Sequence, residues 1–146
     1  VAQTANSRGD LAADLDRDGW LDLFVVNDDR ASRLYWSRQE TRDRGVHWIS
    51  LRLVGDPTLP GAHRSSRDAI GARVTITADI DGDGHDEHLT RMVVSGSGNA
   101  ASTSSLEVEA GLGDDAVVDV LIRWPSGRDT LLLDVPADQF LTVTEQ

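Results

Sequence analysis

The chain has 146 residues, a formal net charge of −11, 39% hydrophobic residues and neither cysteine nor lysine. This length fits one domain, or one domain with a fragment of another, and it allows a hydrophobic core without disulfides. The composition excludes disulfide frameworks, thiolate zinc sites, Schiff-base chemistry and Walker-type phosphate loops. The acidic balance argues against a nucleic-acid partner, and no apolar run is long enough for a membrane span.

The first part of the chain predicts a polar lead-in, an acidic loop and two short strands. Residues 1–9 are small and polar without periodicity, which is typical of a flexible segment. They contain no basic-then-apolar leader, so we expect a mature or trimmed chain. Residues 10–37 contain an Asp-rich loop that runs into an apolar strand near 21–26, and a second strand is expected at 33–37.

The remainder of the chain predicts an all-β domain. Residues 38–46 form a charged linker, and alternation of apolar and polar residues begins at residue 47, where Ile49, Leu51 and Leu53 share one face of HWISLRLV. Turn sequences such as GDPTLPG, GLGDD and PSG separate the later segments, and no segment has a helical period. The pattern favours an antiparallel β-sandwich or a barrel-like domain. Further strands are expected at 72–78, 88–95, 105–110, 117–124, 128–133 and 139–144.

Nine of the 25 acidic residues lie in two segments of one design, DLDRDGWLD (14–22) and DIDGDGHDE (79–87). Each has acidic residues at loop positions one, three, five and nine and glycine at position six. Alternating carboxylates on a tight turn converge on one point, which suits the roughly six to eight oxygen ligands of Ca²⁺. The predicted ligands are Asp14, Asp16, Asp18, the Trp20 carbonyl and Asp22 in the first loop, and Asp79, Asp81, Asp83, the His85 carbonyl and Glu87 in the second.

These loops do not have the EF-hand pattern. Position twelve is Val25 in the first loop and Thr90 in the second, where an EF-hand has glutamate, and strands rather than helices follow. The alternative interpretation is a solvated Asp–Gly turn that binds no metal. For a single DxDG sequence, this interpretation and a calcium loop have about equal weight. Two complete DxDxDGxx[DE] loops in one chain favour calcium, and we expect two ions.

Several motifs resemble known families. GDLAADLDRDGWLDLFVVND (9–28) with RLYWS (33–37) resembles the end of an FG-GAP/VCBS repeat, the blade unit of integrin-type β-propellers. HWISLRLVG (47–55), AIGARVTI (69–76), GLG (111–113), IRWPSG (122–127) and LTVTE (141–145) resemble an ASPIC/UnbV domain. The resemblance implies a partial propeller-type repeat with a calcium loop at 10–37, followed by an ASPIC/UnbV-like β-domain at 47–146. In that domain the second calcium loop replaces a short hairpin turn, and GSGNAASTSS (96–105) lacks the family's aromatic residue.

The resemblance to the C-terminal region of cartilage acidic protein-like secreted proteins implies an extracellular or cell-surface location. We expect a non-catalytic, calcium-binding adhesion or interaction module with a protein or glycan partner, because the histidines and acids form no catalytic motif. One alternative is a self-assembling subunit whose incomplete blade is completed by strand addition, giving a filament or oligomer. Another is a carbohydrate-binding domain with a platform of tryptophans, Trp20, Trp36, Trp48 and Trp124. The tripeptide Arg8-Gly9-Asp10 fits the repeat pattern better than an integrin ligand.

Overall fold

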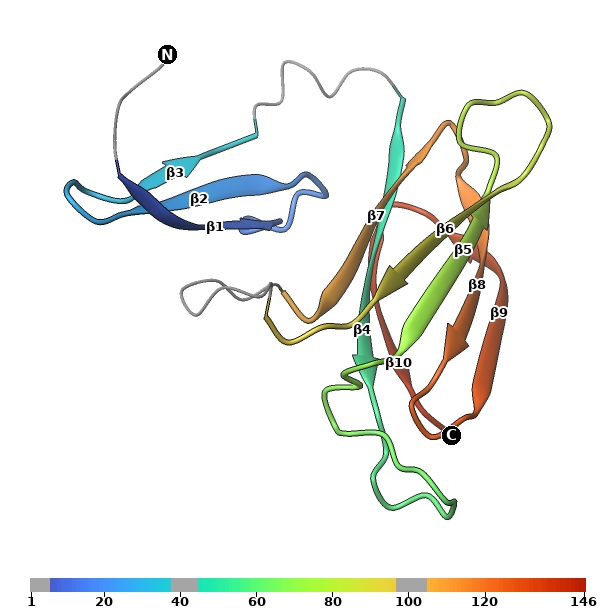
Figure 1. Cartoon of the computed structure of the whole chain (residues 1–146). Helices are drawn as coiled ribbons and strands as arrows, with labels where there is room; N and C mark the ends of the chain where they lie inside the picture. Colours follow the sequence, from blue (N-terminus) through green and yellow to red (C-terminus); the bar gives the residue numbers. More distant parts are fainter. Residues whose placement is uncertain (1–5, 38–44, 97–104) are drawn as a thin grey trace.

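The computed structural model describes residues 6–37, 45–96 and 105–146. Within these ranges the chain forms ten strands in three sheets, none of them closed into a barrel, which confirms the predicted all-β, sandwich-like class (Figure 1). Most of the predicted lead-in and linker, and most of GSGNAASTSS, lie outside the described residues. No helix long and apolar enough to cross a membrane occurs in the described ranges.

The first sheet consists of β1 (Ser7–Ala13), β2 (Asp22–Asn27) and β3 (Arg33–Tyr35) in that spatial order, with antiparallel pairing. Strand β1 includes three residues of the segment expected to be a flexible lead-in, and it pairs with β2 along its length. The sequence of β1 alternates weakly, so its pairing depends on β2, whose Leu-Phe-Val-Val run has high strand propensity.

The remaining strands form two sheets that face each other. One has the order β10–β4–β7, and the other has the order β6–β5–β8–β9. All neighbouring pairs are antiparallel except β10 and β4, which are parallel because the chain crosses from β9 to the opposite sheet and enters it alongside β4. The strands are β4 (His47–Val54), β5 (Arg73–Ala78), β6 (Glu87–Met92), β7 (Glu107–Gly113), β8 (Val117–Arg123), β9 (Asp129–Pro136) and β10 (Gln139–Thr144).

The hydrophobic core fills the space between these two sheets. The inward face of β4 is the one expected from its alternation, because Ile49, Leu51 and Leu53 are at most 1% exposed. Alternate residues of β5, β7 and β8 join the same cluster, and so does Trp124, whose Nε1 donates a hydrogen bond to Thr130 Oγ1 at 2.8 Å. Burial of this apolar surface is the main stabilising contribution to the domain.

Two of the family-like motifs, IRWPSG and LTVTE, meet the loop after β4 at one corner of this domain. Glu145 is almost fully buried, and its carboxylate accepts hydrogen bonds from Ser126 Oγ and from the Asp56 amide, the latter at 2.9 Å. Burial alone would raise the pKa of Glu145. Hydrogen bonds from Ser126, Asp56 and Ser65 and the charge of Arg128 outweigh burial, so this pKa lies below its ordinary value. The carboxylate therefore joins the end of β10 to two loops.

Candidate metal centres

The two acidic loops fold with the same pattern of hydrogen bonds. In each, the carboxylate at position one accepts from the amides of positions five and six, the carboxylate at position five accepts from position seven, and the carboxylate at position nine accepts from position two. In the first loop these are Asp18 N to Asp14 (3.0 Å), Gly19 N to Asp14 (2.7 Å), Trp20 N to Asp18 (3.0 Å) and Leu15 N to Asp22 (3.2 Å). In the second they are Asp83 N to Asp79 (3.0 Å), Gly84 N to Asp79 (2.9 Å), His85 N to Asp83 (2.9 Å) and Ile80 N to Glu87 (2.9 Å).

The backbone conformations of the loops also correspond. Positions four and six have positive φ in both: Arg17 (61°) and Gly19 (91°) in the first loop, Gly82 (73°) and Gly84 (87°) in the second. Residues with side chains rarely adopt this conformation, and glycine adopts it freely. The repeated glycine at position six is therefore required by the turn itself.

Each turn gathers three carboxylates. Asp14, Asp16 and Asp18 place one oxygen each within 4.8 Å of one another, and Asp79, Asp81 and Glu87 do so in the second loop. The other predicted carboxylate ligands, Asp22 and Asp83, fall outside these groups. Six of the predicted side chains thus lie in two compact oxygen clusters, which are the ligand type that Ca²⁺ prefers.

The position-nine residues explain why the two clusters differ. Asp22 is 2% exposed, and its two oxygens accept hydrogen bonds from Leu15 N and, at 2.9 Å, from Ser37 N. It therefore ties the loop to the chain segment after β3. The longer side chain of Glu87 bonds to the loop amide of Ile80 through one oxygen and reaches the cluster with a carboxylate oxygen.

Negative charge accumulates in the first loop. Partial desolvation and the charge of Asp18 raise the pKa of Asp16, and Asp22 and Asp14 contribute to the same shift. Each of these effects disfavours the charged form of Asp16. A cation in the cluster would oppose them and favour the ionised carboxylate.

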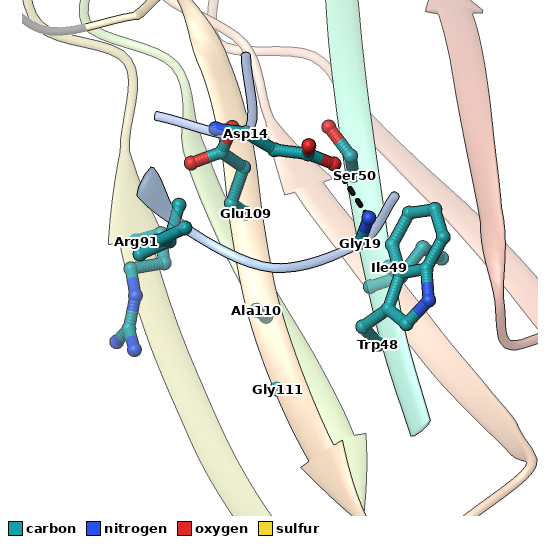
Figure 2. Close-up of a pocket in the computed structure, with 10 residues that line it drawn as sticks. Asp14, Gly19, Trp48, Ile49, Ser50, Arg91, Glu109, Ala110 and Gly111 are labelled. Atoms are coloured by element: carbon teal, nitrogen blue, oxygen red, sulfur yellow. Dashed lines mark hydrogen bonds between the residues drawn. The ribbon is translucent and has the colours of Figure 1, made fainter. Parts of the chain in front are cut away.

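The first loop packs directly on the β-domain (Figure 2). The Asp14 amide donates to Glu109 Oε1 on β7 at 3.2 Å, and Arg17 lies over the Phe140 ring at 4.0 Å from its centroid. A Cβ atom added at Gly19 would lie 2.1 Å from the indole of Trp48, so the loop backbone rests against this ring. We call this contact of the first loop with Trp48, Glu109 and Phe140 the clasp.

The clasp covers a face of the sheet that the alternation of β4 predicts to be open. Ser50 points away from the core side of β4, yet it is only 2% exposed and its Oγ has no hydrogen-bond partner among the described residues. It lines a cavity of about 150 Å³ together with Asp14, Trp48 and Glu109 (Figure 2). Sequence reasoning missed the clasp, because its contacts join residues that are 29 to 123 positions apart in the chain.

The second loop is anchored differently, at the end of β7. The Asp79 amide donates to Asp115 Oδ2 at 2.9 Å, and the Ile80 carbonyl accepts from the Asp114 amide at 3.3 Å. Gly113 has a φ of 61°, and a Cβ there would lie 1.8 Å from the Ile80 carbonyl oxygen. The last glycine of GLG is thus fixed both by its conformation and by the close approach of the second loop.

The other binding features considered from the sequence are dispersed. Trp124 lies in the core, Trp48 lies against the first loop, and Trp36 is 53% exposed beyond β3. A carbohydrate platform of these rings with Trp20 stays a prediction. The Arg8-Gly9-Asp10 tripeptide lies within β1, where Arg8 forms an ion pair with Asp28 at 2.6 Å. It occupies a paired strand rather than a loop tip.

The structure thus defines the class of the chain: a two-sheet β-domain preceded by a three-stranded repeat, with one acidic loop associated with each. Comparison with family models gives the family. The model described as ASPIC and UnbV matches residues 61–146, and the model of the FG-GAP-like repeat matches residues 14–90, a span that contains both acidic loops. Each match covers more than half of the chain, and the chain belongs to the ASPIC and UnbV family and carries an FG-GAP-like repeat.

The predicted family resemblance is therefore confirmed. FG-GAP repeats typically occur in extracellular or surface proteins and often bind calcium. No curated protein matches the chain.

Proposed function

We propose that the chain is a calcium-binding, non-catalytic interaction module of an extracellular or cell-surface protein, with one Ca²⁺ in each acidic loop. The observation that carries the proposal is the shared construction of the loops. Two segments 65 residues apart adopt the same hydrogen bonds and the same positive-φ positions, and each brings three carboxylates within 4.8 Å. An ordinary solvated turn does not require this agreement.

Calcium in the first loop would also stiffen the molecule. Asp14 contributes its carboxylate to the cluster and its amide to the clasp, so the metal ligand and the domain contact belong to one residue. Neutralising the cluster removes repulsion among carboxylates that lie next to Glu109, whose pKa is already raised by burial. We infer that calcium fixes the β1–β3 sheet on the β-domain, as an adhesion module that carries load requires.

Thermal unfolding with calcium and with chelator tests the proposal. A ligand that binds only the native state stabilises it by about 2.7 kcal/mol at a hundredfold excess over its Kd. We expect the midpoint to rise with calcium concentration and to respond much less to magnesium, which demands stricter octahedral geometry. Equal midpoints in calcium and in chelator would contradict calcium binding.

Self-assembly is a second candidate function, favoured by the exposed edges of the first sheet. Strands β1 and β3 have no further strand beside them in the described part of the chain. Leu34, Tyr35 and Trp36 are 38%, 50% and 53% exposed at the β3 edge. Unpaired apolar edges recruit other strands, and a head-to-tail contact that does not close gives a filament. The size of the molecule in solution distinguishes this candidate from the first.

A further inference from the structure

The outer face of the β6–β5–β8–β9 sheet, on the side away from the core, carries a groove of about 570 Å³. This sheet is labelled in Figure 1, with β9 at its edge. The groove has a basic end with Arg73 and Arg123, a floor of threonine hydroxyls, and an apolar side with Leu121, Leu131 and Leu133. The lining also includes His88 and, away from the arginines, Asp119, whose carboxylate accepts a hydrogen bond from the Asp134 amide at 3.0 Å. It lies on the sheet opposite the one that the first loop covers.

The basic end is unusual in a chain with a net charge of −11. Arg73 on β5 and Arg123 on β8 are exposed register partners, so two positive charges lie directly opposite each other on neighbouring strands. Like charges in this arrangement are destabilising. Asp129 lies across from Arg123 on β9, but neither arginine forms an ion pair with any described residue. An anion between the two guanidinium groups would relieve the repulsion.

The apolar side chains of the groove are also exposed to solvent. Leu131 and Leu133 on β9 are 59% and 62% exposed, the highest values among the large apolar side chains of the described residues. Leu131 lies opposite Leu121 on β8, one row of side chains along from Arg123. Rows on one face are two residues, or about 6.6–6.8 Å, apart along a strand.

We propose that this groove binds an extended acidic segment of a partner protein, with a carboxylate on the Arg73–Arg123 pair and apolar side chains on the leucines. The row spacing fits a strand-like peptide in which two apolar residues lie two and four positions after the residue that carries the carboxylate. A polyanionic glycan offers the charge but no apolar side chains for three leucines, so the observations favour a peptide. The inference gives the proposed interaction module a partner of defined chemistry, and it does not require bound calcium.

Titration of the ¹⁵N-labelled chain with the blocked peptide Glu-Ser-Leu-Ser-Leu-Ser tests the proposal by amide chemical shifts. We expect shifts along β5, β8 and β9, in calcium and in chelator alike. Arg73→Gln and Arg123→Gln are each expected to weaken binding about threefold, and salt is expected to weaken it further. Arg30→Gln, at an exposed arginine between β2 and β3, is the matched control and should leave the affinity unchanged.

Two altered peptides and one glycan distinguish the contribution of the carboxylate charge from that of the apolar contacts. Replacing Glu by Gln should abolish the effect of the arginine substitutions, and replacing both leucines by serine should remove the shifts on β9. If a sulfated oligosaccharide binds at these residues and the peptide does not, or if neither binds, the peptide proposal is wrong. Concentration-dependent association that Leu131→Asp abolishes would show a second copy of the chain as the occupant and would also overturn it. Retained calcium binding in any of these cases leaves the proposed calcium function intact.

Discussion

Position six of the two acidic loops is glycine in both, but the two glycines differ in whether neighbouring atoms leave room for a side chain. Gly19 and Gly84 have nearly the same positive φ, 91° and 87°. A Cβ at Gly19 would lie 2.1 Å from the Trp48 indole, whereas a Cβ at Gly84 would meet nothing within 4 Å. The same substitution at both positions therefore isolates the energy of the clasp.

We predict that Gly84→Ala lowers the free energy of unfolding by about 1–2 kcal/mol, because alanine is strained at positive φ. Gly19→Ala should cost about 1–3 kcal/mol more, because the Trp48 ring is held against Phe140 at 4.9 Å and resists displacement. Urea unfolding in chelator measures both variants without a contribution from calcium. Equal costs would show that the Trp48 ring moves aside freely and that the clasp is loose.

If each acidic loop binds one calcium ion, removing a single carboxylate should change the number of ions bound. Asp16 and Asp81 occupy position three of their loops, and each belongs to its carboxylate cluster. We predict that calorimetry finds two calcium ions in the parent chain and one in Asp16→Ala or Asp81→Ala, because each loses a charged ligand. Asp129→Ala, which removes an acid outside both loops, is the control. A variant that keeps two ions would show that its loop was misassigned.

Among the elements, the end of β10 depends on one buried carboxylate. Glu145 joins this strand to the turn at Ser126 and to the loop at Asp56. We predict that Glu145→Gln lowers the free energy of unfolding at neutral pH by about 1–3 kcal/mol, because the donors Ser126 Oγ and the Asp56 amide lose their charged acceptor. Urea unfolding measures this loss, and a neutral outcome would show that the corner tolerates an uncharged acceptor.

The same residue gives the stability a defined pH dependence. Since the pKa of Glu145 is lowered on folding, its contribution is present above the unfolded pKa of about 4.3 and is lost as pH falls through the folded value. In chelator, the parent chain should therefore lose more stability between about pH 5 and about pH 3 than Glu145→Gln does. Identical slopes in the two proteins would refute this linkage.

At the scale of the whole molecule, β1 and β3 are the edge strands of the first sheet in the described part of the chain. If the β3 edge recruits a neighbouring copy, light scattering should show a mass that rises with concentration, and Leu34→Asp should abolish the rise, because a charge on an edge strand opposes pairing. Val117→Asp, at an exposed position of β8 outside both the first sheet and the groove, is the matched control for this edge. A single species at every concentration, with calcium present, would rule out self-assembly and leave the interaction module.

The sequence alone determined features that depend on neighbouring residues. Period-two alternation identified β4 and β10 with their bounds and predicted the buried face of β4. The spacing of aspartates and glycines predicted the two acidic loops, because position-specific hydrogen bonds and positive φ are local properties of a turn. The motifs also gave the family, which the matches at 14–90 and 61–146 confirm.

The tertiary structure decided features in which distant segments meet. Strand β1 has a weak pattern of its own and exists because β2 lies beside it. The parallel pairing of β10 with β4, the clasp on Trp48, and the corner at Glu145 all join residues far apart in sequence. The Arg73–Arg123 pair arises from the register of two strands, which no local pattern specifies. Alternation says which residues face outward, but only packing decides which outward face is covered by the first loop and which is left as an open groove.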